Sequence, residues 1–125
     1  MGGGQQYSIM AVIDMMNACK CDVSTVALGS VSGSAVLVLA SGAKGKRFSM
    51  KNARIIVNQP LGGTQGSYID VRLQAQEQNR NLKIAQLVLS QNTGQSMDSA
   101  AELLDRDSFL SAEQAIALGI IDGVI

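Results

Sequence analysis

The chain has 125 residues, 46% hydrophobic and only 3% aromatic, which suits one domain with a core of aliphatic side chains and methionine. Ten basic residues balance ten acidic ones, so charge gives no reason to expect nucleic acid or an anionic membrane as a partner. No apolar run approaches the roughly 20 residues of a membrane-spanning helix. The chain contains no histidine, the side chain that most often takes the proton of a catalytic serine.

The first predicted elements are an amphipathic helix and a short buried strand. Apolar residues recur at helical spacing between Ile9 and Met16, which predicts a helix over residues 6–18. Its methionines are expected to fill gaps in the core, and a soft binding surface is the alternative interpretation; they are Met10, Met15 and Met16. The β-branched run 23–28 predicts a buried strand that ends at Gly29.

The two cysteines, Cys19 and Cys21, lie at the junction between this helix and this strand. A pair without histidine or further cysteine cannot complete the usual ligand set of zinc, so we expect no metal site. Two free thiols in a reducing compartment are the favoured interpretation.

A segment of small residues, 29–34, leads from the strand into a predicted helix that begins at Ala35 and ends near Gly42. A strand, a tight turn and a helix in this order expose main-chain N–H groups that can bind an anion or an oxyanion. Close packing of the helix on the strand explains the same composition, so both interpretations stay open.

Two strands and a long helix follow. The strands are predicted over 47–50 and 54–57, around a Lys51-Asn52 turn, and the single proline, Pro60, ends the second. After a glycine-rich segment, a helix is predicted from Ser67 to about Asn92. Its centre is almost wholly polar and its last turns regain an apolar stripe. Such a helix projects from the body of a protein or lies against a polar partner.

The C-terminal part predicts two short helices and a strand. Ser96 is expected to cap the first helix, and Ser111 begins a capping box that opens the second, which Gly119 closes. Residues 120–124 form the predicted final strand. Short strands that alternate with helices favour an α/β fold with a largely parallel sheet.

Several motifs in fixed order resemble the caseinolytic protease subunit ClpP; they are residues 22–26 (DVSTV), 40–48 (ASGAKGKRF), 58–63 (NQPLGG), 93–96 (TGQS) and 106–112 (RDSFLSA). The resemblance implies the ClpP/crotonase-like superfold of stacked ββα units. It implies a single domain, 1–125, with a head (1–60 and 94–125) and a projecting handle of a strand plus a long helix (61–93). The N-terminal third of a ClpP subunit has no counterpart in this sequence.

The resemblance also carries over the positions of the catalytic groups. The nucleophilic serine corresponds to Gly33, the basic histidine to Asn58 and the orienting aspartate to Asp107, which is retained. The two main-chain N–H groups of the oxyanion hole correspond to Gly4 and Ser34. Two of the three catalytic groups are therefore missing, and we expect no proteolysis.

This pattern resembles ClpR, the non-catalytic ClpP paralogue of cyanobacteria and plastids. It implies a structural or regulatory subunit of a Clp protease complex, in a homo- or hetero-heptameric ring with ClpP-type catalytic subunits, served by an AAA+ Clp ATPase. No cofactor is implied. The expected location is the plastid stroma, of a chloroplast or an apicoplast, or the cytoplasm of a cyanobacterium. Arg106 corresponds to an arginine of the contact between rings, and Asp70 is a plausible acidic partner.

The polar centre of the handle suggests how rings assemble. Gln78, Asn79 and Asn81 stand where the family usually has apolar residues, so two identical rings are expected to dock weakly. Two alternative functions stay open. One is a crotonase-type acyl-CoA enzyme, although Glu77, Glu102 and Glu113 lie away from the glycine turns. The other is a stand-alone peptide-binding module that uses residues 61–66.

Overall fold

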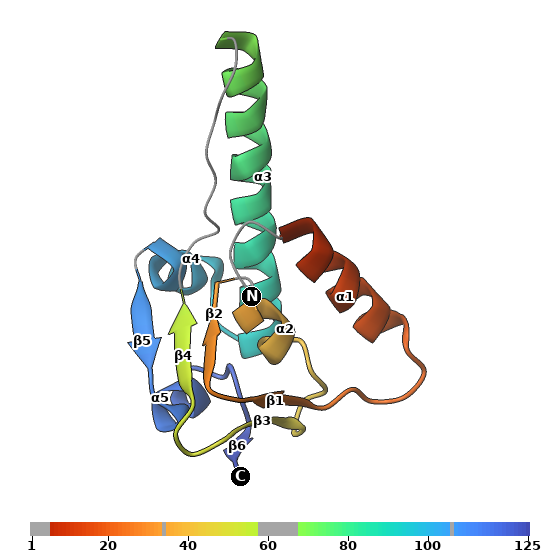
Figure 1. The fold of residues 1–125 in the computed structure, drawn as a ribbon, viewed down its shortest axis with the longest axis vertical. Coiled ribbons are helices and arrows are strands. Elements are labelled where there is room, and N and C mark those ends of the chain that lie inside the picture. Colours follow the sequence, from red (N-terminus) through yellow and green to blue (C-terminus); the bar gives the residue numbers. More distant parts are fainter. Residues whose placement is uncertain (1–5, 34, 58–67, 106) are drawn as a thin grey trace.

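A computed structural model describes residues 6–33, 35–57, 68–105 and 107–125. Two small sheets and a group of helices form the body, and one long helix rises beyond them (Figure 1). The helices are α1 (Gln6–Ala18), α2 (Ala35–Ala40), α3 (Tyr68–Thr93), α4 (Met97–Asp105) and α5 (Ala112–Ala117). The strands are β1 (Thr25–Ala27), β2 (Ser30–Ser32), β3 (Arg47–Ser49), β4 (Arg54–Val57), β5 (Ser108–Leu110) and β6 (Gly123–Val124).

The first four strands alternate between the two sheets. In the first sheet, of order β1-β3-β6, all pairings are parallel. In the second, of order β2-β4-β5, β2 and β4 are parallel and β5 is antiparallel. The chain twice places one strand in the first sheet, the next in the second, and then forms a helix. These two stacked ββα units confirm the fold class that the resemblance implies.

The core lies between the two sheets and the helices that cover them. Helix α2 is at its centre and packs against α1, α3, β1, β2 and β4. The largest fully buried apolar side chains among the described residues are aliphatic: Ile9, Val36, Ile55, Val57, Leu89, Ile120 and Ile121. This agrees with a composition that is poor in aromatic residues.

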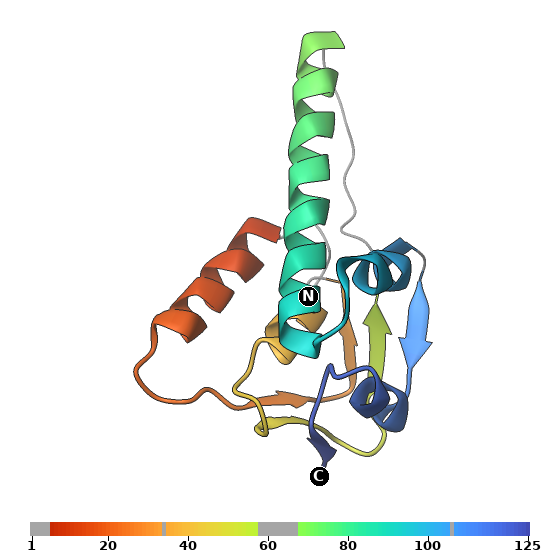
Figure 2. The ribbon, with the colours of Figure 1, turned by 180° about the vertical axis from the view of Figure 1, so that it is seen from behind.

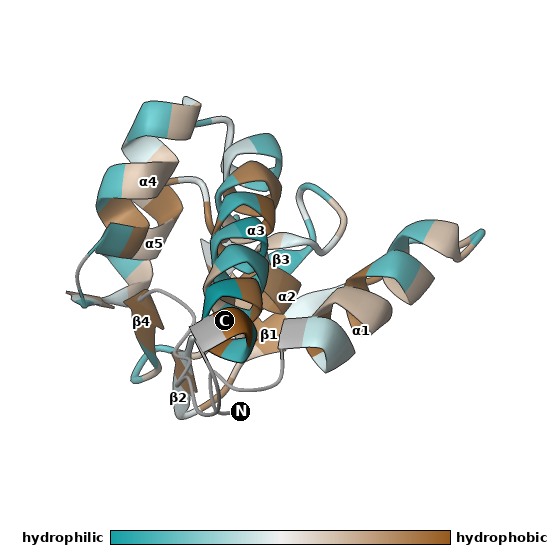
Figure 3. Ribbon diagram, turned by 90° about the horizontal axis from the view of Figure 1, so that it is seen from above, coloured by the Kyte–Doolittle hydropathy of each residue, from teal (hydrophilic) through white to brown (hydrophobic). Residues whose placement is uncertain are grey.

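Helix α3 changes character along its length. Its last turns carry Ala85 and Leu89, which are buried in the core. Its first turns carry Ile69 and Leu73, which are 66% and 57% exposed because that end lies away from the sheets (Figure 2). Hydrophilic residues cover much of the helix (Figure 3). No helix in the described ranges combines the length and the apolar character needed to cross a lipid bilayer.

The structure corrects three expectations. The predicted small-residue turn 29–34 contains strand β2, which the pairing with β4 stabilises. The sequence predicted one largely parallel sheet, but the structure has two. Strand β5 was not predicted. Met15 was expected to fill the core, but it is 67% exposed because Ile9 and Ile13 occupy the buried face of α1.

Candidate functional site

One edge of the sheet β2-β4-β5 brings three strand ends together. Ser32, the last residue of β2, lies opposite Ile56, and Val57, the last residue of β4, lies opposite Ser108, the first of β5. Because β2 and β4 are parallel and β5 is antiparallel, the ends of the first two strands meet the start of the third. The last residues of β2 and β4 and the first residue of β5 therefore lie at the same edge.

Gly33 leaves β2 at this edge and turns the chain into α2. Its φ of 60° lies in the left-handed region, which a residue with a side chain adopts only with strain. Its carbonyl oxygen accepts a hydrogen bond from the main-chain N–H of Val36 (3.2 Å), inside α2. A sharp strand-to-helix turn of this kind presents the nucleophilic serine in many hydrolases. Gly33 itself has no side chain that could act as a nucleophile.

Asp107 enters β5 at the same edge, and its side chain is exposed. The structure thus brings Gly33 and Asp107, two of the positions predicted from the resemblance, to one end of one sheet. The third position, Asn58, directly follows Val57 in the sequence and lies outside the described residues.

The remaining predicted positions are Gly4, Ser34, Asp70 and Arg106. Gly4, Ser34 and Arg106 lie outside the described residues. Asp70 is exposed in the first turn of α3, at the end of the helix that is far from the sheets (Figure 1).

The chemistry available at this edge is limited. A carboxylate and a glycine turn are present, but no imidazole exists in the chain to link them as in a Ser-His-Asp triad. Within the described ranges, no group of three or more histidine, cysteine, aspartate or glutamate side chains could hold a metal ion. The described residues at this edge offer one carboxylate, Asp107, that can accept hydrogen bonds.

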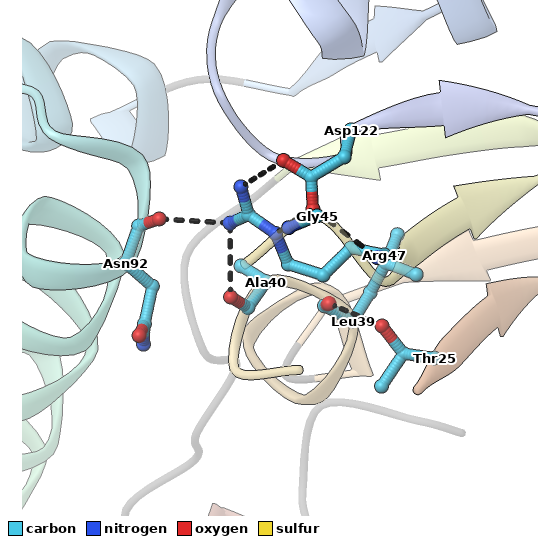
Figure 4. Close-up of polar contacts among 7 residues, drawn as sticks. All are labelled: Thr25, Leu39, Ala40, Gly45, Arg47, Asn92 and Asp122. Carbon is cyan, nitrogen blue, oxygen red and sulfur yellow. Dashed lines mark hydrogen bonds and ion pairs between the residues drawn. The ribbon is translucent and has the colours of Figure 1, made fainter. Parts of the chain in front are cut away.

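A buried ion pair, which sequence reasoning missed, holds the C-terminal end of α3 against the first sheet (Figure 4). The guanidinium of Arg47 donates from Nε and Nη2 to the two carboxylate oxygens of Asp122, at 2.8 Å each. Its Nη1 donates to the carbonyl oxygens of Ala40 (3.2 Å) and Asn92 (2.8 Å). The side chain of Arg47 is 5% exposed and that of Asp122 is 25% exposed. The pair therefore joins β3, β6 and the ends of α2 and α3.

The electrostatics of the pair favour the charged carboxylate. The hydrogen bonds from the Arg47 guanidinium lower the pKa of Asp122 from 3.8 to about 2, against the opposing effect of partial burial. The main-chain N–H groups of Arg47 and Gly45 also donate to Oδ2 and act in the same direction. Arg47 and Ser49 occupy the two buried positions of β3, which only the structure reveals.

Further contacts fix α2, and with it the turn at Gly33. Thr25 Oγ1 donates to the carbonyl oxygen of Leu39 (2.8 Å), which ties α2 to β1 (Figure 4). Asn92 Nδ2 donates to Ser41 Oγ (3.2 Å), which ties the end of α2 to α3. Gly42 leaves no room for a Cβ atom, which would lie 2.6 Å from Thr25 Oγ1. The helix that follows the turn is therefore held on several sides.

Comparisons with known proteins agree with this architecture. Residues 1–125 match the family model described as Clp protease. The chain is 41% identical, over 123 residues, to the Arabidopsis thaliana protein named ATP-dependent Clp protease proteolytic subunit 4, chloroplastic. The aligned region covers 98% of this chain and 42% of that relative, so the chain spans less than half of the relative's length. On these grounds the chain belongs to the Clp protease family, as its motifs predicted.

Proposed function

We propose that this chain is a non-catalytic subunit of a Clp protease ring complex, with a structural or regulatory role in ATP-dependent protein degradation. The observation that carries the proposal is the edge of the sheet β2-β4-β5 at which both Gly33 and Asp107 lie, on either side of β4. A glycine stands there in the turn that would hold a nucleophile, and the sequence has asparagine at position 58 and no histidine anywhere.

The loss of these two groups is large in energetic terms. In another serine protease, removal of the nucleophile or the base alone lowers turnover by roughly a million-fold. Asp107 alone does not replace them, because an aspartate of this kind orients an imidazole and does not attack the substrate. Asp107 is exposed at this edge, where its carboxylate can accept hydrogen bonds.

The partners belong to the same proposal. The chain joins a heptameric ring, with itself or with ClpP-type catalytic subunits, and an AAA+ Clp ATPase acts on that complex. The name of the relative supports ATP dependence and a plastid location. Asp70, exposed at the far end of α3, and Arg106 are the proposed contacts between rings.

The polar centre of α3 sets the proposed strength of docking between rings. Gln78 and Asn79 are exposed and Asn81 is half-buried, whereas a stable interface normally buries an apolar centre. We expect single or mixed rings to be preferred over two identical rings. A stable homomeric double ring at micromolar concentration, seen by native mass spectrometry, would contradict this.

The first test is the mass of the protein in solution, alone and mixed with a catalytic ClpP-type subunit, with peptidase activity measured on the same samples. We expect no activity from the chain alone, entry into rings with the partner, and a changed activity of those rings. A chain that has no activity, stays monomeric and leaves the partner unchanged would contradict the proposed role.

A second test asks whether Gly33 and Asn58 are the vacant triad positions. The double variant Gly33→Ser/Asn58→His should regain covalent labelling by a fluorophosphonate in mixed rings whose partner subunit carries an inactivated serine. The matched control is Gly29→Ser/Asn58→His, because Gly29 also has a left-handed φ, of 63°, but lies outside the turn. Equal labelling of both variants, or of neither in intact rings, would refute the assignment.

Neither alternative function is favoured. Glu77, a candidate acid for acyl-CoA chemistry, lies on α3 and accepts hydrogen bonds from Tyr7 and Arg80. Glu102 and Glu113 lie on α4 and α5, and neither belongs to the turn at Gly33. Residues 61–66, the peptide-pairing segment of the other alternative, lie outside the described residues.

A further inference from the structure

Sulfur-containing side chains gather at the C-terminal end of α1. Met15, Met16, Cys19 and Cys21 lie within seven consecutive positions. Both thiols are free and exposed, Met15 is 67% exposed, and Met16 is half-buried. Three of the four side chains line one open hollow on the surface, whose remaining walls are apolar; its lining residues are Ala11, Val12, Met15, Met16, Cys19 and Val23.

The local backbone places two of these sulfur atoms on the same side. The main-chain N–H of Cys19 donates to the carbonyl oxygen of Met15 (3.1 Å), so the last helical turn continues to Cys19. Side chains four positions apart on a helix are neighbours on its surface. Cys21 follows at a bend two residues later. This end of α1 and the turn after it lie at the outer edge of the molecule, away from the second sheet, in both opposite views (Figures 1 and 2).

Among the lining residues, the side-chain atoms that could bind a metal are the sulfur atoms of Met15, Met16 and Cys19. None of the described residues that line the hollow carries a carboxylate, and the nearby Asp22 is paired with Lys46 (2.9 Å). Thiolate and thioether ligands select Cu(I), whereas carboxylate and carbonyl oxygens suit Mg²⁺ and Ca²⁺. Zinc in a structural site needs four ligands, and this requirement excludes it here. The requirement does not apply to Cu(I), for which two or three sulfur ligands suffice.

We propose that the thioether of Met15 and the thiolate of Cys19, which line this hollow, bind one Cu(I) ion together with the thiolate of Cys21, two residues further along the chain. Each thiol releases its proton to solvent as its sulfur binds the metal. The copper keeps its oxidation state, so the step needs no oxidant and no reductant. The site is independent of the sheet edge at Gly33 and of the proposed ring function.

The test is an anaerobic titration of the reduced full chain with Cu(I) in competition with bicinchoninate, whose coloured copper complex fades as the protein takes the metal. We expect one Cu(I) per chain. Cys19→Ser, Cys21→Ser and Met15→Leu should each weaken binding by about tenfold or more, the range typical of altered metal sites. The matched control is Met97→Leu, which removes another exposed methionine (42%), on α4, and should bind like the wild type.

A measurement on the unmodified chain guards against variants that fold poorly. In a methyl NMR spectrum, added Ag(I), a redox-silent substitute for Cu(I), should shift the Met15 methyl signal and leave that of Met97 unchanged. A reduced protein that leaves all copper with the chelator would overturn the proposal. Equal copper affinity of Met15→Leu and Met97→Leu would also overturn it, because the hollow would then play no part.

Discussion

The substitution Asp122→Asn tests the ion pair that joins the first sheet to α3. It removes the negative charge and leaves the guanidinium of Arg47, only 5% exposed, with neutral acceptors alone. Breaking one half of a buried ion pair typically costs about 3–5 kcal/mol of folding free energy. Because the carboxylate of Asp122 is 25% exposed and water can replace part of its contacts, we expect about 2–4 kcal/mol.

The lowered pKa of Asp122 gives a second measure of this stabilisation and shows how it depends on pH. A pKa that falls from 3.8 in the unfolded chain to about 2 in the folded one corresponds to about 2 kcal/mol at neutral pH. Partial exposure to solvent makes this an upper bound. Since the folded pKa is the lower one, this stabilisation is complete above the unfolded value of 3.8 and is lost as the pH falls through about 2.

The assay is urea unfolding followed by circular dichroism, for the wild type and Asp122→Asn, at a series of pH values from neutral to strongly acidic. The difference in unfolding free energy should be largest at neutral pH and shrink as Asp122 becomes protonated. Asp22→Asn is the matched control, because its pair with Lys46 is exposed at both ends and should matter little. A difference that does not change with pH, or an equal loss in the control, would refute the reasoning.

Three further predictions concern packing and helix ends, each measured by the same unfolding assay at neutral pH. Gly119→Ala and Gly45→Ala both place a side chain at a left-handed φ, of 82° and 86°, which costs about 1 kcal/mol. Gly119→Ala should lose at least about 2 kcal/mol more, since its methyl group would collide with a main-chain oxygen at the end of α3, and equal losses would contradict this. Leu89→Ala should cost about 3 kcal/mol because Leu89 is 0% exposed, whereas Leu87→Ala, at a side chain 46% exposed, should cost less than about 1. Ser111→Ala removes the capping box of α5 and should cost about 1 kcal/mol; an unchanged stability would show that the cap contributes nothing.

Helical periodicity predicted α1 and α3 well, because an apolar repeat over several turns is a strong local signal. Strand β4 was also predicted with its observed bounds, 54–57, since a β-branched run stands between a turn and the segment that contains a proline. Strands β2 and β5 have three residues each, too few to show an alternating pattern. They exist because β4 offers hydrogen-bonding partners on both sides, and that information is not local.

The candidate site, like the fold, could be predicted only in part. Gly33, Asn58 and Asp107 were assigned from the resemblance to a family, since nothing in their local composition marks them as catalytic positions. The partnership of Arg47 and Asp122 could not be predicted from the sequence, because no periodic pattern relates two residues so far apart. Helical periodicity was also too coarse to place single methionines such as Met15 on the buried or the exposed face.

The pairing of Arg47 with Asp122 also bears on the order of events during synthesis. Seventy-five positions separate the two residues, and β3 finds one of its two neighbours only in β6. While a ribosome still holds the last residues, the first sheet lacks an edge strand and the arginine lacks its counter-ion. Closure of such a long loop is slow because chain entropy must be lost before contacts form. A nascent chain that stops short of residue 122 therefore carries a cation at the centre of the fold without its carboxylate partner.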